Sequence, residues 1–337
     1  MRLSNVSKRC KLLALGAAAV LSLGLMASCG SSDQSASSGS GKNYKLGIVQ
    51  LVEHNALDAA NKGFVDGLKE RGFVEGKNIT IDRQNAQADQ SNLQNIAQRF
   101  VSAKMDLICA IATPAAQTMA NATHDIPIVG TAITDYEGAK LVASNKEPKG
   151  NVTGTSDMNP VKEQIDLLLK IKPDAKTIGT VYCSSEVNSE VQVKAMKEYA
   201  ESKGLTVKVA TISTVNDIQQ AAQSLVGSVD AFYEPTDNII ASAMPTLIDI
   251  TNAAKIPVIC GEPNMVKAGG LATYGIDYYK LGVQTGHMAA DILEGKKPGS
   301  MPIEMAKDLK VTVNKANAAL LGITFPEDVL KNADTVE

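Results

Sequence analysis

Apolar and polar positions along this chain follow two periods in turn. Residues 44–51 form a short apolar run typical of a buried strand, and residues 57–71 place apolar side chains at helical spacing. The helical segment ends in a basic last turn at Arg71 and a glycine cap at Gly72. The alternation continues and predicts strands at 78–83, 107–112 and 126–131 and helices at 89–102 and 114–122.

An irregular stretch at 135–155 interrupts this alternation. It carries Pro148, Gly150 and Gly154, and we expect it to form a crossover. The alternation then begins again, with helices expected at 160–172, 186–203, 215–226 and 238–254 and strands at 177–183, 205–212, 231–233 and 257–260. Strands alternating with helices in two halves predict an α/β protein with two doubly wound, Rossmann-like lobes.

The two lobes are not expected to be continuous in sequence. Residues 269–276, a helix at 279–293 and the tail after Met301 are expected to cross back between them. Two domains agree with the length, because the roughly 300 residues from position 44 onward are more than one typical domain holds. The expected division is 44–156 with about 277–305 for the first lobe, and 157–276 with about 306–330 for the second.

Residues 1–28 have the features of a signal peptide. Basic residues precede an uncharged apolar run at 12–26, which is too short to span a bilayer by itself. Ala27, Ser28 and Cys29 follow, an arrangement similar to the lipobox of bacterial lipoproteins, so we expect Cys29 to become a lipidated N-terminus. The alternative is an ordinary secretory signal with an incidental cysteine. Residues 29–43, rich in serine and glycine, are expected to form a flexible tether.

Charge limits the classes of partner. The first 28 residues carry four basic and no acidic side chains, so their removal changes the formal net charge from −3 to −7. A chain of this charge is not expected to bind nucleic acid or an anionic membrane surface. We therefore expect contact with the membrane through the lipid anchor only.

Neither a metal site nor a disulfide framework is expected. The histidines lie outside any cluster of histidine or cysteine residues, and the three cysteines after Cys29 sit in or at the end of β-like runs. An odd number of such cysteines argues against a disulfide framework. We expect no cofactor. The residues concerned are His54, His124, His287, Cys109, Cys183 and Cys260.

The turns that follow the predicted strands are rich in groups that cap helices or hold polar solutes. In parallel sheets, ligands bind at the carboxyl ends of the strands. Thr113 is expected to be an N-cap with Pro114 as the first helical residue, which leaves N–H groups free for a carboxylate. The alternative for each turn is a helix cap facing water. The other turns are Thr134-Asp135, Ser184-Ser185-Glu186, Pro235-Thr236-Asp237-Asn238 and Glu262-Pro263-Asn264.

Several segments in the same order resemble one known family. They are Gly47-Ile48-Val49-Gln50, Ala112-Thr113-Pro114-Ala115-Ala116-Gln117, Ala132-Ile133-Thr134-Asp135, Asn151-Val152-Thr153-Gly154-Thr155-Ser156-Asp157, Ser184-Ser185-Glu186-Val187-Asn188-Ser189 and Pro235-Thr236-Asp237-Asn238. They look like the ABC-transporter substrate-binding family that includes the tryptophan-binding TrpX-type lipoproteins, and the resemblance covers 44–326. It implies a type I periplasmic-binding-protein fold, in which ligand is closed between two lobes joined by a three-strand hinge.

The resemblance also implies a ligand, a site and partners. Its characterised members bind aromatic amino acids, so it implies that Thr113 to Ala115 hold the ligand carboxylate, Asp237 the ammonium, and the turn from Ser184 to Asn188 the contacts of the opposite lobe. It further implies a monomer that delivers ligand to an ABC permease. The expected ligand-binding residues are Gln50, Leu51, His54, Thr113, Pro114, Ala115, Thr134, Asp135, Ser184, Ser185, Asn188, Asp237, Asn238 and Glu262.

Some residues depart from the family pattern. Leu51 and Tyr136 stand where relatives often have an aromatic residue and a proline. Glu53, Asn55 and Glu234 are expected to make the site more polar than a tryptophan slot. Another small amino acid or a nucleoside-like solute is therefore the alternative ligand. The tyrosines considered for stacking on a ligand, with packing at the core edge as the alternative, are Tyr136, Tyr182 and Tyr233.

Other classes of function fit the sequence less well. Glu186, Asp237 and Glu262 are possible general acids and Ser184 a possible nucleophile, but no histidine lies in the five turns to activate a serine. The sequence has neither a Gly-x-Ser-x-Gly elbow nor a glycine-rich phosphate loop. A transcription regulator would need a DNA-reading helix pair where residues 1–43 stand. A ligand-sensing lipoprotein and a hydrolase remain as alternatives, and we expect no enzyme.

Overall fold

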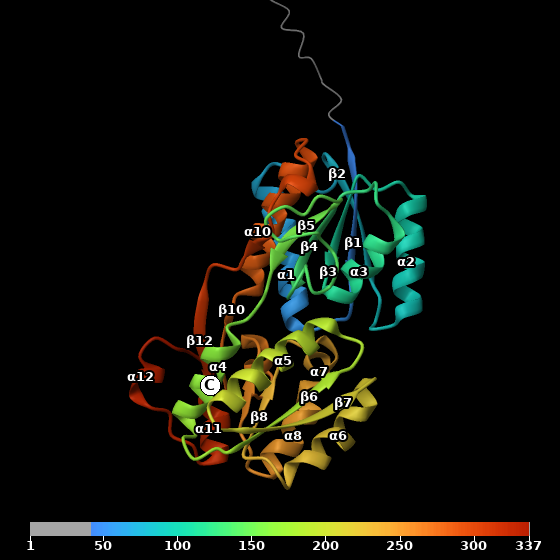
Figure 1. Ribbon diagram of the computed structural model, residues 1–337. Helices are drawn as coiled ribbons and strands as arrows, with labels where there is room; N and C mark the ends of the chain where they lie inside the picture. The colour runs from blue at the N-terminus through green and yellow to red at the C-terminus, as the bar shows by residue number, and fades with distance from the viewer. Residues whose placement is uncertain (1–41, 337) are drawn as a thin grey trace, which may run out of the picture. The chain divides into compact units, whose positions relative to one another are not determined.

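A parallel sheet of six strands organises the first lobe (Figure 1). The computed structural model describes residues 42–336, and its strand order here is β11-β5-β4-β3-β1-β2. Helices α1 and α10 cover one face of the sheet, and α2 and α3 cover the other. The strands are β1 (Tyr44–Gln50), β2 (Ile79–Asn85), β3 (Leu107–Ile111), β4 (Ile128–Ile133), β5 (Val152–Ser156) and β11 (Glu304–Met305). The helices are α1 (Asn55–Glu70), α2 (Gln90–Ser102), α3 (Thr113–Ala122) and α10 (Tyr278–Leu293).

A sheet of seven strands organises the second lobe in the order β13-β12-β10-β9-β8-β6-β7. Every strand pair is parallel except β10 with β12. The strands are β6 (Thr177–Cys183), β7 (Thr206–Ile212), β8 (Ala231–Glu234), β9 (Val258–Cys260), β10 (Ala272–Ile276), β12 (Leu309–Asn314) and β13 (Asp334–Val336). The helices are α4 (Val161–Ile171), α5 (Val187–Ser202), α6 (Ile218–Val226), α7 (Asn238–Ser242), α8 (Met244–Ala253), α9 (Pro263–Lys267), α11 (Lys315–Leu321) and α12 (Glu327–Leu330).

The second sheet is apolar on both faces, as a strand between two helical layers requires. Successive residues of β8 point to opposite sides: Tyr233 packs in the core beneath α4 and α5, and Phe232 in the core beneath α6 and α8. Both side chains are fully buried. The expected α/β architecture with two doubly wound, parallel-rich sheets is therefore confirmed.

Three segments connect the two sheets. The chain passes to the second lobe after Ser156 at the end of β5, returns after Ile276 at the end of β10, and passes again after Met305 at the end of β11. Residues that follow β4, β5, β8 and β9 line one cleft, so the carboxyl ends of these strands face one another between the lobes.

Glycines allow α1 and α10 to pack closely. A Cβ atom added at Gly63 would lie 2.1 Å from the carbonyl oxygen of Tyr279, and one added at Gly282 would lie 2.1 Å from that of Ala60. Gly67 and Gly286 face the opposite helix in the same way. The two backbones therefore approach too closely for any larger residue at these four positions.

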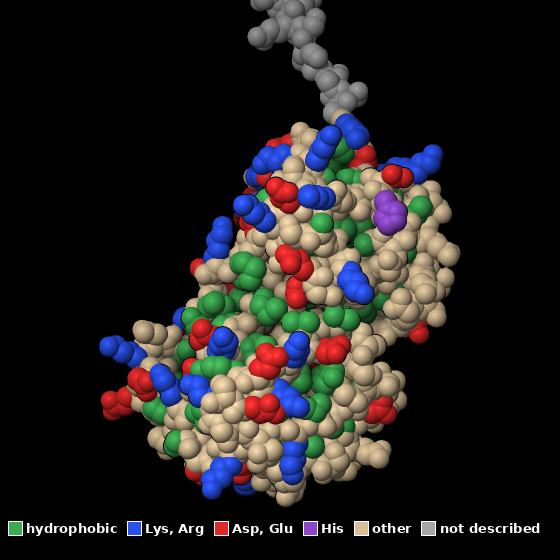
Figure 2. All heavy atoms as spheres, viewed as in Figure 1, with side chains coloured by type: hydrophobic (Ala, Val, Ile, Leu, Met, Phe, Trp, Pro, Cys, Tyr) green, Lys and Arg blue, Asp and Glu red, His purple; other side chains and the backbone are tan. Residues whose placement is uncertain are grey.

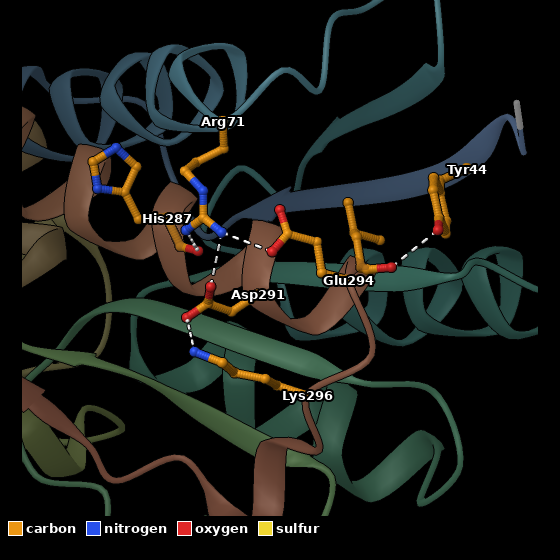
Figure 3. Close-up of polar contacts among 7 residues, drawn as sticks. Tyr44, Arg71, His287, Asp291, Glu294 and Lys296 are labelled. Atoms are coloured by element: carbon orange, nitrogen blue, oxygen red, sulfur yellow. Dashed lines mark hydrogen bonds and ion pairs between the residues drawn. The ribbon is translucent and has the colours of Figure 1, made fainter.

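Charged side chains hold the outer ends of the same two helices (Figure 3). The guanidinium of Arg71, at the end of α1, lies 2.9 Å from Asp291 and 2.8 Å from Glu294. Lys296 lies 2.8 Å from the other oxygen of Asp291. We call these four residues the α1–α10 ion network. Over the face shown in Figure 2, acidic and basic side chains are likewise interspersed.

The structure differs from the sequence predictions in several places. The stretch expected to be irregular, 135–155, ends in strand β5, which continues to Ser156. The helix expected at 238–254 is two helices, because the chain leaves the helical conformation at Ala243. The tail after Met301 contains strands and helices that the apolar pattern did not predict.

The predicted signal peptide, Cys29 and all but the end of the predicted tether lie outside the described residues. Within residues 42–336, none of the helices combines the length and the apolar character needed to cross a membrane.

Candidate functional site

A narrow cleft separates the carboxyl ends of the two sheets. The space left in it for the centre of a water molecule is about 10 Å³, about what one buried water needs. The cleft is therefore nearly closed. Its lining residues are His54, Ala56, Leu57, Ala132, Thr134, Asp157, Asn188, Thr236, Asp237, Asn238, Ala241, Glu262, Met265 and Tyr278.

Six of the residues predicted to bind ligand line this cleft. They come from turns of both lobes, and they are His54, Thr134, Asn188, Asp237, Asn238 and Glu262. The other predicted residues do not line it, and they are Gln50, Leu51, Thr113, Pro114, Ala115, Asp135, Ser184 and Ser185. Ser184 and Ser185 are exposed, because the chain turns outward after β6. It returns to the cleft at Asn188, in the first turn of α5.

Gln50 holds the turn after β1. Its amide nitrogen donates to Asp58 at 2.6 Å, and its amide oxygen accepts from Asn61 at 3.0 Å. Leu51 is buried in the core of the first lobe. Asp135 accepts a hydrogen bond from the backbone N–H of Gly138. These side chains therefore stabilise the turns that carry the cleft residues.

Helix α3 begins differently from the sequence prediction. The helix starts at Thr113 and its N-cap is Ala112, whose φ of 86° lies in the left-handed region. The expected N-cap role of Thr113 is therefore wrong. The Thr113 hydroxyl, at 1% exposure, has no hydrogen-bond partner. A buried hydroxyl without a partner is costly, so it indicates a missing hydrogen-bond partner.

Asp157 is a cleft residue that the predicted set did not contain. It follows β5 at the first crossing between the lobes, and it is 3% exposed. The Tyr278 hydroxyl donates to one carboxylate oxygen at 2.6 Å, and the Thr134 hydroxyl donates to the other at 3.1 Å. Burial raises the pKa of Asp157, although these two hydrogen bonds oppose the shift.

Asp237 and Glu186 form a pair of buried carboxyl groups in the second lobe. Asp237 caps α7 through the Ile240 N–H and also accepts from the Cys183 N–H and the Ser189 hydroxyl. Burial raises its pKa. Burial, with a further contribution from the Asp237 charge, raises the pKa of Glu186 to about 8.

Glu262 and His54 complete the ionisable groups of the lining. Glu262 caps α9 by accepting from the N–H groups of Asn264 and Met265, and burial raises its pKa to about 7. His54 is half-buried, and its Nε2 lies 3.2 Å from Oδ1 of Asn238 in the opposite lobe. Burial lowers the pKa of His54, which favours the neutral ring.

The cleft thus gathers acids without a lysine or arginine to pair with them. Neither lysine nor arginine lines it, and none of the ion pairs among residues 42–336 involves Asp157, Asp237 or Glu262. Buried carboxylates without a cation are unfavourable unless a partner is supplied. The arrangement therefore suits a ligand that brings its own positive charge.

The tyrosines considered for stacking lie elsewhere. Tyr136 and Tyr233 are fully buried within the two lobes, where their hydroxyls donate to Thr155 and Gln164. Tyr182 does not line the cleft either. The aromatic side chain of the lining is Tyr278, which follows β10. The rule that sites lie at strand ends would have found it.

The expected polar departures also lie away from the lining. Glu53 and Asn55 are exposed. Glu234 is fully buried, accepts from the Val181 N–H, and its other oxygen has no partner. Burial raises its pKa well above the usual range. The described residues contain no group of three histidine, cysteine, aspartate or glutamate side chains arranged to hold a metal ion.

Comparison with known proteins agrees with this geometry. The chain is 44% identical over 311 residues to a tyrosine-binding protein of Clostridioides difficile (strain R20291), which covers 90% of both chains. It superposes with a TM-score of 0.85 and 43% identity on an ABC domain from Streptococcus pneumoniae in complex with L-Trp, covering 88% of this chain and all of that one.

A third relative is in another state. The ligand-free, open structure of a substrate-binding protein with adhesive properties from Clostridium difficile is 48% identical, with 87% of this chain and 99% of that one covered and a TM-score of 0.68. The type I periplasmic-binding-protein fold expected from the sequence is confirmed by such neighbours. The model of the family of ABC transporter substrate binding proteins matches residues 45–337. The chain therefore belongs to the ABC transporter substrate-binding protein family.

Proposed function

We propose that this protein captures an aromatic amino acid between its lobes and delivers it to an ABC permease. Two relatives support the ligand class: one is a tyrosine-binding protein at 44% identity, and the other was crystallised with L-Trp at 43% identity. Each relative matches this chain over nearly its whole length. The observation on this chain that carries the proposal is the cleft of buried acids, which neither lysine nor arginine lines.

The charges of the cleft match one end of a zwitterionic amino acid. The ligand ammonium supplies the cation that the buried carboxylates lack, and an ammonium paired with a desolvated carboxylate is a strong contact. The ligand carboxylate is proposed to lie at the start of α3. There the N–H groups of the first turn and the unpartnered hydroxyl of Thr113 are available.

Closure of the lobes completes the proposal. The cleft has room for about one water, so an aromatic side chain enters only when the lobes part. The higher TM-score with the L-Trp complex than with the open, ligand-free relative, at similar identity, supports a closed arrangement here. The moving parts are proposed to be 44–156 with about 277–305, and 157–276 with about 306–330, joined by the three crossings.

The proposal also covers the cellular setting. Substrate-binding proteins of ABC transporters are extracytoplasmic. We propose that lipid on Cys29 anchors this one, that it acts as a monomer, and that its partner is the permease of an importer. The family and its neighbours are solute-binding proteins rather than enzymes, and the ligand is proposed to leave unchanged.

The absence of tryptophan from the chain gives a direct test. L-tryptophan excited at the red edge of its absorption should change its emission on mixing with the protein, because only the ligand then fluoresces. L-tyrosine and L-phenylalanine should compete with it, whereas L-alanine and a nucleoside should not. Failure of all three aromatic amino acids to bind would contradict the proposal, and binding of the nucleoside instead would favour the alternative ligand class.

A further inference from the structure

Asp157 retains acceptor capacity that the protein does not use. An ionised carboxylate has about four acceptor positions, and the structure fills two of them, with the hydroxyls of Tyr278 and Thr134. The carboxylate is 3% exposed and lines the cleft. Further donors must therefore come from within the cleft rather than from bulk water.

Asn188 presents a second unsatisfied acceptor to the same cleft. Its amide nitrogen donates to the backbone carbonyl of Thr236 at 3.2 Å and to Glu186 at 2.8 Å. Because a backbone carbonyl only accepts, these contacts fix which end of the amide is nitrogen. The amide oxygen is buried and has no hydrogen-bond partner. A buried acceptor without a donor in a cleft indicates a missing donor group.

A short series of hydrogen bonds links the two acceptors across the lobes. Thr134, which donates to Asp157, accepts from the Gln192 amide nitrogen at 3.3 Å. The same nitrogen lies 3.4 Å from the backbone oxygen of Asn188. Asp157 lies at the first crossing, where Thr134 and Tyr278 of the first lobe hold its carboxylate, and Asn188 lies on α5 of the second lobe. A donor group placed between them would link Asn188 to the first lobe through Asp157.

The other acids of the lining already accept several hydrogen bonds from the protein. Asp237 and Glu262 each accept three hydrogen bonds, and in each case two of the donors are backbone N–H groups. Such caps are rigid and leave fewer acceptor positions. The partners of Asp157 are hydroxyl groups, which rotate to suit a new neighbour.

We infer that Asp157 and Asn188 form the subsite for the ligand's ammonium group, the role that the family resemblance implied for Asp237. The inference rests on the proposed function. An ammonium group carries three donors, enough to satisfy both acceptors and to join the lobes when ligand is bound. Thr134 and Tyr278 position the carboxylate, and Asp237 serves as the cap of α7.

The test compares ligands with and without the amine. Calorimetric titrations use L-tryptophan against 3-indolepropionate, and L-tyrosine against 3-(4-hydroxyphenyl)propionate, which differ only in the amine. Wild-type protein should prefer the amino acids strongly. Asp157→Asn should lose affinity for them by roughly 30-fold to several-thousand-fold, while affinity for the deaminated acids changes little.

Three further variants keep the test independent of folding. Asn188→Ala should weaken amino-acid binding by about 10-fold or more and narrow the preference for the amine. Asp237→Asn should lower the melting temperature but leave that preference intact. Glu234→Gln, a buried acid outside the lining, is the matched control and should bind as wild type does. Circular dichroism melting identifies any variant that does not fold.

The outcomes distinguish a failure of the inferred ammonium subsite from a failure of the proposed function. If Asp157→Asn and Asn188→Ala keep the full preference for the amine, the ammonium lies elsewhere and the inference is overturned while the proposed function stands. If Asp237→Asn loses the preference for the amine instead, Asp237 contacts the ligand ammonium, as the family resemblance implied. If wild-type protein binds none of the aromatic amino acids, the proposed function fails and the inference fails with it.

Discussion

Two groups of carboxylates in this protein meet opposite surroundings. In the α1–α10 ion network, Asp291 and Glu294 face Arg71, and Lys296 adds a second cation at Asp291 (Figure 3). Partial burial opposes ionisation there, but the hydrogen bonds from Lys296 and Arg71 prevail and lower the pKa of Asp291. In the cleft, Asp157 has no cation and its pKa is raised.

The difference separates a structural site from a binding site. The ion network satisfies its own charges and joins two helices that never need to part. The cleft leaves acceptors unsatisfied between two lobes that, on the proposed function, part and close around a ligand. A site that is incomplete without ligand gains most from binding it, at the cost of stability when empty.

The largest effect should come from the packing under the ion network. In Gly282→Ala, the new Cβ would lie 2.1 Å from the Ala60 carbonyl oxygen, so α1 and α10 must separate. We expect a loss of about 3 kcal/mol or more in the free energy of unfolding. Urea denaturation measures it, with Gly227→Ala as control, because a Cβ there meets nothing within 4 Å. Equal stability of the two variants would contradict the packing described here.

The affinity for ligand should depend on pH, through the carboxyl groups of the cleft and not through those of the α1–α10 ion network. Burial raises the pKa of Glu262 to about 7 and also raises that of Asp157. A bound ammonium favours the ionised carboxylates, so binding should release protons, and affinity should fall as pH falls through about 7, the raised pKa of Glu262. The limit is about tenfold per pH unit for one proton. Neutral His54 and the hydroxyl of Tyr278, which face these groups, do not reverse the sign.

Proton release is measured by titrating ligand in two buffers of different ionisation enthalpy. An observed heat that is independent of the buffer at pH 7 would mean that no carboxyl group changes its protonation on binding. That result would contradict the claim that a bound ammonium ionises carboxyl groups of the cleft.

Much of the fold follows from the sequence, because long segments with one clear period are decided locally. The predicted strand at 177–183 is β6 as found, and the helix predicted at 279–293 differs from α10 by one residue. Strand β5 was missed because Thr153, Gly154 and Thr155 give no apolar alternation. Their strand conformation depends on pairing with β4.

The site was predicted only in part, because its residues follow strands that the sequence predicts with unequal success. Strand-end turns place Thr134, Asp237 and Glu262 at the cleft. The rule cannot tell which residue of a turn faces inward, so Ser184 was chosen although it is exposed. Asp157 was missed because its position follows from a strand defined only by tertiary pairing.

A smaller effect is expected from Glu234, a buried acid outside the lining. Its raised pKa keeps it protonated when folded, whereas the unfolded chain loses this proton above the ordinary value of 4.5. The folded state should therefore lose stability as pH rises above 4.5, by at most about 1.4 kcal/mol per pH unit. Glu234→Gln removes this loss, so its advantage over wild type in urea denaturation should grow between pH 5 and pH 8. A constant difference would contradict the assignment.

The smallest effect should come from the ion network itself. Arg71 is partly exposed, so Arg71→Gln should cost about 1 kcal/mol or less in the free energy of unfolding, with a smaller loss at high salt. Its affinity for L-tryptophan should equal that of wild type. A change in affinity would show that the network and the cleft are coupled, contrary to the comparison drawn above.

A crystal structure of the protein with L-tryptophan or L-tyrosine tests the central claim most directly. The account predicts the ligand between the two sheets, with its ammonium nitrogen within hydrogen-bond distance of a carboxylate oxygen of Asp157 and of the amide oxygen of Asn188. A ligand bound outside the cleft, or an ammonium that contacts neither residue, would contradict it.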